Sequence, residues 1–322
     1  MKRILTGIKP TGSFHIGSYA GFLQSLLFFQ KKNYEIFLMI ADSHALTDPS
    51  NIKEIKKIKK EMVAEIIALG VDSEKVNIFL QSENPYHFYL AWILSCFTSL
   101  GDLYRMHHFK ELTQKLKIKK EIINSGALYY PVLQAADILI YQADIVPVGE
   151  DQKQHIELAR EIARNFNKKV KKIFKIPKEY ILETGRIMSL SNPYKKMSKS
   201  EPEGILGIFE PKEKIIEKIK KAVTDSDNQI IYNKATKPGI SNLILIYKIL
   251  TEKSIQEIEK EFKGVSYKDF KEKIIEEFFK KFEAAREKKK EILSKVDIYL
   301  EKGKEIALSV ASETIKKINE LV

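Results

Sequence analysis

A glycine-containing segment near the N-terminus carries residue types that suit phosphate binding. Residues 10–19 read PTGSFHIGSY and lie between an apolar run and a stretch with helical periodicity. Such a turn presents the first backbone N–H groups of a helix, which together with the helix dipole favour an anion. Gly12 and Gly17 allow a nucleotide to approach the backbone closely, and His15 can hydrogen-bond phosphate oxygens. The alternative is an ordinary glycine turn with a surface histidine.

A lysine-containing pentapeptide is the second candidate for phosphate chemistry. Residues 196–200 read KMSKS and lie within a segment rich in glycine and proline, residues 185–210. Lys196 and Lys199, with hydroxyl groups beside them, suit a loop that closes on a triphosphate and stabilises the charge of departing pyrophosphate. In so lysine-rich a chain, the same pentapeptide could also arise by chance.

Two aspartates stand in sequence surroundings that imply a partner. Asp151 follows an apolar run that ends at Gly149, so its carboxylate is placed to accept hydrogen bonds from ribose hydroxyls. Asp137 is flanked by alanine, isoleucine and leucine, where a carboxylate is costly unless it is paired. No Ser/His/Asp or Cys/His arrangement stands out, so the sequence does not favour a covalent enzyme intermediate.

Alternating strand and helix patterns must position these residues. Short apolar runs predict strands at residues 3–7, 36–41, 76–81 and 144–149. Helical periodicity predicts helices at residues 20–29, 51–69 and 153–166. The alternation predicts parallel pairing through right-handed crossovers, and therefore an α/β fold with a doubly wound sheet. In such sheets ligands bind beyond the carboxyl ends of the strands, where the segment 10–19 and Asp151 are expected.

The second half of the chain has a different pattern. Charged stretches with helical periodicity occupy residues 212–222, 241–251, 254–263, 267–293 and 296–320. The glycine- and proline-rich segment 185–210 separates them from the strand and helix alternation. We therefore predict a catalytic domain over residues 1–192, followed by the 196–200 loop and an all-helical domain within residues 193–322.

Composition restricts the class of protein. The chain has 322 residues, 44% hydrophobic and 30% charged, which is typical of a globular protein and argues against disordered, fibrous and disulfide-rich classes. Cys96 is the only cysteine, so no intrachain disulfide or cysteine-based zinc site can form, and a cytoplasmic location is expected. Lys9 and Pro10 interrupt the N-terminal apolar run before it reaches signal-peptide length. The most apolar stretch, residues 89–100, is shorter than the ~20 residues of a membrane span, so we expect no membrane segment.

The net charge of +12 is unevenly distributed along the chain. Residues 1–150 hold 17 Lys and Arg against 15 Asp and Glu, whereas residues 151–322 hold 38 against 28. A basic excess confined to one half indicates a polyanionic partner, with nucleic acid as the first candidate. Lysine-rich composition on solvated helix faces is the alternative explanation.

Both phosphate-binding candidates resemble signatures of the class I aminoacyl-tRNA synthetases. The sequence His15-Ile-Gly-Ser18 resembles their HIGH motif, with Ser18 in place of the second histidine. Residues 196–200 match the KMSKS loop of the same class, in the expected position between the two halves of the chain. A hydroxyl at position 18 can still donate a hydrogen bond to phosphate or ribose.

Further segments resemble the bacterial-type tryptophanyl-tRNA synthetases closely and the tyrosyl enzymes only loosely. These segments cover both halves of the chain in order: residues 130–138, 146–155, 186–190, 222–226 and 237–243. The resemblance implies a Rossmann-like catalytic domain with a helical anticodon-binding domain, working as a homodimer. It also implies that L-tryptophan and ATP form tryptophanyl-adenylate, with Mg²⁺ accompanying ATP and no structural metal. Tryptophan would then be transferred to the terminal ribose of its tRNA.

The resemblance assigns roles to particular residues. The catalytic residues are expected to be His15, Lys110, Lys196 and Lys199. The ATP-binding residues are expected to be Lys9, Pro10, Thr11, Gly17, Ser18, Gly149, Glu150, Asp151, Ile187, Lys196, Met197, Ser198, Lys199 and Ser200. The tryptophan-binding residues are expected to be Tyr130, Gln152, His44 and Asp137, with the Asp137 carboxylate accepting the indole N–H. For His44, a role as a core histidine remains open.

Two positions depart from the pattern of the family. Lys9 stands where many relatives have glutamine, which would add a cation to the triphosphate site. Gln134 stands where methionine is common beside the indole.

Two alternatives remain open, and the sequence argues against a third. A tyrosine-specific synthetase shares both signatures. A non-catalytic RNA-binding paralogue should have lost elements of the HIGH or KMSKS motifs, which this chain retains. A small nucleotidyltransferase with a similar turn would have no reason to carry the long helical half.

Overall fold

The computed structural model describes residues 1–115, 117, 119, 122–181, 186–197 and 201–321. Within these residues, parallel strands form one sheet in the order β3-β2-β1-β4-β5. The strands are β1 (Lys2–Ile8), β2 (Tyr34–Ile40), β3 (Val76–Leu80), β4 (Ile145–Pro147) and β5 (Lys178–Tyr180). This order confirms the doubly wound sheet and each of the predicted strands. The sequence did not predict β5, because a strand of three residues, Lys-Glu-Tyr, is too short to show a strand pattern.

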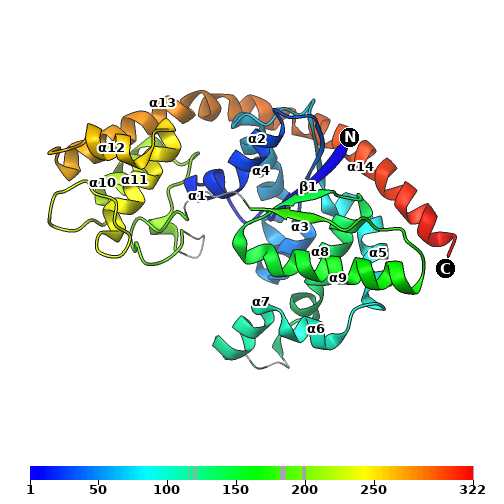
Figure 1. Cartoon of the computed structure of the whole chain (residues 1–322). Helices are drawn as coiled ribbons and strands as arrows, with labels where there is room; N and C mark the ends of the chain where they lie inside the picture. The colour runs from blue at the N-terminus through cyan, green and yellow to red at the C-terminus, as the bar shows by residue number, and fades with distance from the viewer. Residues whose placement is uncertain (116, 118, 120–121, 182–185, 198–200, 322) are drawn as a thin grey trace.

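Helices surround the sheet and continue beyond it (Figure 1). The helices of the first half are α1 (Ile16–Ser18), α2 (Gln24–Phe29), α3 (Asp42–Ala45), α4 (Ile55–Ala68), α5 (Tyr86–Ser95), α6 (Leu100–Arg105), α7 (His107–Lys110), α8 (Ser125–Ile140) and α9 (Lys153–Lys169). A π-helical turn, η1 (Tyr19–Leu23), joins α1 to α2 into one helical run. None of the helices in the described part of the chain is long and apolar enough to cross a membrane.

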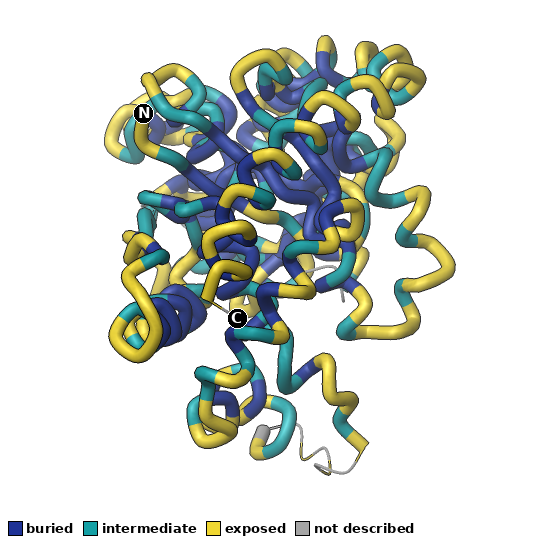
Figure 2. The backbone as a smooth tube through the Cα atoms, turned by 90° about the vertical axis from the view of Figure 1, so that its right-hand side faces the viewer, coloured by how far each residue is buried: buried dark blue, intermediate teal, exposed yellow. Residues whose placement is uncertain are grey.

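Both faces of the sheet are buried, as expected for parallel strands. Alternate residues of β2 belong to different apolar clusters: Ile36 and Leu38 to one, Phe37 and Met39 to the other. The first cluster lies against α2 and α4, and the second against α5, α8 and α9. Figure 2 shows this buried interior surrounded by exposed helix faces and loops. Successive strand side chains point to opposite faces of the sheet, so each strand packs against both helical layers.

The second half is helical, as predicted. Its helices are α10 (Lys212–Lys221), α11 (Pro238–Thr251), α12 (Ile255–Glu261), α13 (Tyr267–Ser294) and α14 (Val296–Asn319). The 28-residue α13 packs against α10 and α11 at one end and against α4 at the other, so it joins the helical group to the sheet layer (Figure 1). At 1.5 Å per residue it is about 42 Å long, which lets it reach both.

The last helix returns to the sheet. The helix α14 packs along β3, and an ideal Cβ at Gly303 would overlap the backbone carbonyl of Ile78. Glycine at this position therefore permits the close approach of helix and strand. The helix α14 therefore packs mainly against elements of residues 1–192, although the sequence pattern groups it with the helical half. The division at residues 192 and 193 stays a prediction.

Candidate active site

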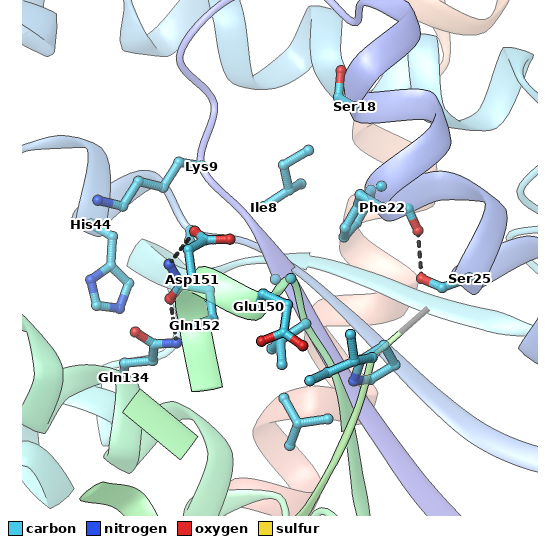
Figure 3. A pocket seen from close by; sticks show the side chains of 18 of the residues that line it. Ile8, Lys9, Ser18, Phe22, Ser25, His44, Gln134, Glu150, Asp151 and Gln152 are labelled. Atoms are coloured by element: carbon cyan, nitrogen blue, oxygen red, sulfur yellow. Dashed lines mark hydrogen bonds between the residues drawn. The ribbon is translucent and has the colours of Figure 1, made fainter. Parts of the chain in front are cut away.

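A cavity of about 950 Å³ lies beyond the carboxyl ends of β1, β2 and β4. The chain changes direction across the sheet between β1 and β4, and this switch point is where open α/β sheets bind ligands. Many residues expected at the site line the cavity: Lys9, His15, Gly17, Ser18, His44, Tyr130, Asp137, Gly149, Glu150, Asp151, Gln152, Ile187, Lys196 and Met197. In Figure 3, Lys9, His44, Asp151 and Gln152 lie on one side and Ser18 and Phe22 on the other, with Glu150 between them.

His15 caps the helical run that starts at Ile16. Its Nδ1 accepts from the Ser18 backbone N–H at 3.3 Å, and the Ser18 hydroxyl accepts from the His15 N–H at 3.0 Å. This reciprocal capping fixes the turn, and it gives Ser18 a defined role at the position where the family has a second histidine. An ideal Cβ at Gly17 would come within 3.1 Å of the imidazole, so glycine leaves the His15 ring in place.

Lys196 is held by a short pairing of two chain segments. It forms an antiparallel bridge with Met188, and the Met197 N–H donates to the Ile187 carbonyl at 3.1 Å. Met197 is buried and anchors this end of the segment. The expected residues Ser198, Lys199 and Ser200 lie outside the described residues. Lys196 and Met197 are therefore the described members of the KMSKS motif, and both line the cavity.

Asp151 lies in a 3₁₀ turn, η6 (Glu150–Gln152), directly after β4. Its Oδ2 accepts from the Gln152 amide at 3.0 Å. Burial raises the pKa of Asp151, but this hydrogen bond and the charge of Lys196 outweigh it, so the net shift is downward. An ideal Cβ at Gly149 would lie 2.7 Å from Asp151 Oδ1, so glycine makes room for the carboxylate. The result is an ionised acceptor at the mouth of the sheet.

Asp137 is an almost completely buried carboxylate, 1% exposed, in the wall of the cavity. Its oxygens accept from His44 Nε2 at 2.8 Å, from His87 Nδ1 at 2.5 Å and from Gln81 Nε2 at 3.0 Å to each oxygen. Burial raises the pKa of Asp137, but the hydrogen bonds and charges of the two imidazoles lower it to about 2. Asp137 is therefore ionised, and it is paired within the protein.

A chain of buried polar groups continues behind Asp137. His87 Nε2 lies 2.8 Å from the Tyr141 hydroxyl, which accepts from the Asn84 amide at 2.9 Å. Because an ionised carboxylate only accepts, His87 Nδ1 carries a proton, and its Nε2 can accept from Tyr141. Each hydrogen bond in the chain is then donated toward Asp137: from Asn84 to Tyr141, from Tyr141 to His87, and from His87 to Asp137. The sequence did not indicate Gln81, Asn84 and His87, because this short segment after β3 meets Asp137 on α8 only in the fold.

Tyr130 lies at the centre of a second cluster. Its hydroxyl is 2.7 Å from His155 Nε2, the centre of the His108 ring is 5.3 Å from that of Tyr130, and Lys9 Nζ is 5.3 Å above its ring. Burial and the charge of Asp151 raise the pKa of Tyr130 to about 12, so the phenol is neutral. Burial, His108 and Lys9 lower the pKa of His155 to about 4. Neutral hydrogen-bonding groups thus surround Tyr130, with Lys9 close to them.

Burial also lowers the pKa of Lys9, whose ammonium group loses hydration in this cluster.

His44 donates a hydrogen bond through Nε2 to Asp137. Its buried Nδ1 has no hydrogen-bond partner among the described residues. That nitrogen can accept a hydrogen bond from a ligand when the ring is neutral and donate one when the ring is protonated. His108 and His155 were not expected site residues, and the paired histidines 107–108 are the signal that could have indicated the first.

Some expected residues lie elsewhere or have new partners. Pro10, Thr11 and Lys110 are not among the residues that line the cavity, and Lys110 is exposed at the end of α7. Gln134 lines the cavity and donates to the Gln152 side chain at 3.3 Å. This amide contact orients Gln152 toward the site. The roles expected for these residues stay predictions.

Known proteins match the chain over nearly its whole length. The family model described as tRNA synthetases class I (W and Y) matches residues 1–283. A tryptophan–tRNA ligase of Caldanaerobacter subterraneus subsp. tengcongensis is 41% identical over 324 residues, covering 99% of this chain and 98% of the relative.

Solved structures agree in fold. A tryptophanyl-tRNA synthetase from Mycoplasma pneumoniae matches with a TM-score of 0.87 and 34% identity, covering 99% of this chain and 97% of that one. The enzyme from Campylobacter jejuni, complexed with ADP and tryptophan, matches with a TM-score of 0.84 and 33% identity, covering 99% and 98%. The family match and the near full-length similarity show that the chain belongs to the class I tRNA synthetases of the tryptophan and tyrosine family.

Proposed function

We propose that this enzyme is a tryptophan–tRNA ligase that activates L-tryptophan with ATP and transfers it to the terminal ribose of its tRNA. The observation that carries the proposal is a single cavity with a capped nucleotide turn on one side and a buried, ionised Asp137 on the other. The near full-length similarity to tryptophan–tRNA ligases favours tryptophan over tyrosine as the substrate.

In the first step the tryptophan carboxylate attacks the α-phosphorus of ATP. A new carboxyl–phosphorus bond forms, the bond to the bridging oxygen breaks, and pyrophosphate leaves with its electron pair. No side chain needs to become covalently attached, so catalysis consists of positioning and charge stabilisation. We assign the ribose hydroxyls to Asp151 and the phosphates to His15, Ser18, Lys9 and Lys196.

The amino-acid side of the cavity would read the indole and the amino group. Gln81 contacts both Asp137 oxygens at equal distance, so one oxygen can accept the indole N–H while Gln81 keeps the other. Tyr130 and Gln152 are assigned to the amino group, with the neutral Tyr130 oxygen as an acceptor. In the second step the tRNA ribose hydroxyl attacks the acyl carbon, the ester forms and AMP leaves.

Magnesium would enter with ATP. The described residues include no group of three or more His, Cys, Asp or Glu side chains arranged to hold a metal ion. Mg²⁺ bound with a nucleotide is usually held mainly by phosphates and water, and we assign it that mode here. When bound, the ion would neutralise phosphate charge, and the role assigned to Lys196 is the same neutralisation from the protein side.

We further propose a homodimer in the cytoplasm. Phe88 and Trp92 lie one turn apart on α5, and Leu100 begins the next helix; all three are exposed, Trp92 by 69%. Grouped exposed apolar side chains of this size support an interface with a second copy of the chain. The single cysteine fits a reducing compartment. The mass of the protein in solution tests the dimer.

Pyrophosphate exchange tests the proposed function. Labelled pyrophosphate should enter ATP in the presence of tryptophan and not with any of the other nineteen amino acids. Exchange that depends on tyrosine would replace the proposal with the tyrosine-specific alternative, and exchange with no amino acid would reject it.

Binding of tRNA should depend strongly on salt. The basic excess of residues 151–322 consists mainly of lysines, which suit phosphate contacts better than bidentate base contacts. We expect affinity for the tryptophan tRNA, measured by filter binding, to fall roughly 10- to 1,000-fold between about 50 and 200 mM salt. An affinity that does not change with salt would mean that the excess charge reflects composition alone.

A further inference from the structure

Glu65 is a fully buried carboxylate, 0% exposed, that does not line the cavity. It belongs to α4, where the adjacent buried residues Ala64 and Ile66 are apolar. A carboxylate in such surroundings is costly unless it is paired and hydrogen-bonded. Its partners therefore indicate its role.

Two partners of Glu65 belong to the nucleotide turn. Its Oε1 accepts from the Ser13 hydroxyl and its Oε2 from the Phe14 backbone N–H, both at 2.7 Å. These residues directly precede His15, which caps the following helix. The carboxylate thus holds the backbone that sets the direction of the His15 imidazole.

The third partner comes from α13. Lys289 Nζ donates to Glu65 Oε1 at 2.7 Å, across 224 positions of sequence, and also lies 5.1 Å above the Phe209 ring. One turn earlier, Arg286 donates to the Ile208 carbonyl at 2.5 Å. The helix therefore contacts both Glu65 and the segment that contains Phe209.

That segment forms the other side of the same turn. The Ile208 N–H donates to the Phe14 carbonyl at 2.9 Å, and the Ile16 N–H donates to the Leu206 carbonyl at 2.9 Å. The nucleotide turn is therefore held between Glu65 and residues 206–208, and α13 contacts both. The other end of α13 packs against α10 and α11, so it carries the helical half of the molecule (Figure 1).

We propose that Glu65 is a positioning residue of the ATP site: it fixes the turn that presents His15, and its pairing with Lys289 makes that position depend on α13. The inference rests on the proposed function, because it concerns ATP use in tryptophan activation. Movement of the helical half, such as tRNA binding would cause, then reaches residues 13–15 through the half-buried Glu65–Lys289 ion pair, beside the Arg286 contact with Ile208. The ion pair is directly connected to the turn, because Ser13 and Lys289 both donate to Oε1 of Glu65.

The first test replaces the pair by apolar residues. The double variant Glu65→Leu/Lys289→Leu leaves no unpaired buried charge, which favours folding. We expect its kcat/KM for ATP in tryptophan-dependent pyrophosphate exchange to fall roughly 10- to 100-fold because the turn is no longer held. Tryptophan affinity, measured by equilibrium dialysis, should stay unchanged. The exchange of the Phe14 amide with deuterium should become faster, because that amide loses its acceptor.

A matched control uses another lysine–carboxylate pair between α4 and the C-terminal helices. Lys60 Nζ lies 2.7 Å from the Asp297 carboxylate in an exposed position away from the turn. The variant Lys60→Leu/Asp297→Leu should keep the ATP constants of the wild type. An equal loss in both double variants would assign the effect to general contact between helices and overturn the proposal.

A second test does not require removal of Glu65. Ser13→Ala and Lys289→Met each remove one partner of Oε1, so their effects on kcat/KM for ATP should be non-additive. Effects that multiply, or ATP constants equal to the wild type in both variants, would overturn the proposal. Wild-type protein without tryptophan-dependent exchange would instead reject the proposed function, so the two failures are distinguishable.

Discussion

Replacing Asp137 by alanine should lower kcat/KM for tryptophan sharply and narrow its advantage over phenylalanine. Tryptophan is the largest amino acid, so a cavity that admits it cannot reject smaller side chains by size alone. A buried carboxylate that accepts the indole N–H is left without that donor when phenylalanine binds. Mismatches of this kind give roughly 10⁴-fold or greater rejection, most of which should disappear in the variant.

The measurement is the ratio of kcat/KM values for tryptophan, tyrosine and phenylalanine. A ratio is needed because Asp137→Ala also leaves the donors of His44, His87 and Gln81 without their acceptor, which lowers stability and total activity. An unchanged ratio, even with poor activity, would mean that Asp137 supports the fold and does not read the indole.

Asp42 provides a matched control for this experiment. It is also buried, and its carboxylate accepts from Lys59 and from the Ser82 backbone and hydroxyl, but it does not line the cavity. Asp42→Ala should therefore lower the free energy of unfolding without changing the selectivity ratio. A change of selectivity in this variant as large as in Asp137→Ala would show that the ratio responds to any lost buried carboxylate.

Replacing Lys196 by alanine should slow adenylate formation while tryptophan affinity is retained. Its ammonium group lines the cavity near Asp151 and is assigned to charge that develops as pyrophosphate leaves. Loss of one such charge raises the barrier by roughly 2 to 4 kcal/mol, or roughly 30- to 1,000-fold in kcat. Single-turnover kinetics measure the rate, and equilibrium dialysis measures tryptophan binding. We expect a similar loss for Lys199→Ala, on the basis of the motif.

The neighbouring Lys195 is the control for Lys196. It is exposed, pairs with Glu201 at 2.5 Å and does not line the cavity, so Lys195→Ala should have little effect on the rate. A loss for Lys196→Ala that appears only in tryptophan binding would contradict the assigned role. Equal losses of rate in Lys195→Ala and Lys196→Ala would mean that the net charge of the segment, and not the position of Lys196, determines the rate.

Local sequence patterns were sufficient for the strands β1 to β4, for several of the helices and for recognising both signature motifs, but not for β5, α5 or α8. The strand at 36–41 was predicted because burial of both sheet faces leaves a continuous apolar run, and the helix at 153–166 because burial of one helix face leaves a 3.6-residue period. The turn at residues 12–18 was predicted because its glycines and its place between an apolar run and a helical stretch are visible within that segment. Asp151 was recognised because it follows its strand directly, at the edge where such sheets bind ligands.

Other features depend on residues that are distant in sequence and were decided by the tertiary structure. Asp137 was recognised as a buried carboxylate, but its partners come from α3, α5 and the turn after β3, and no local period relates these positions. The return of α14 to β3 and the pairing of Glu65 with Lys289 were equally invisible, because a helical pattern records which face is buried and not what covers it. A buried charge needs a partner, and the chain meets that requirement only when the fold brings the partner to it.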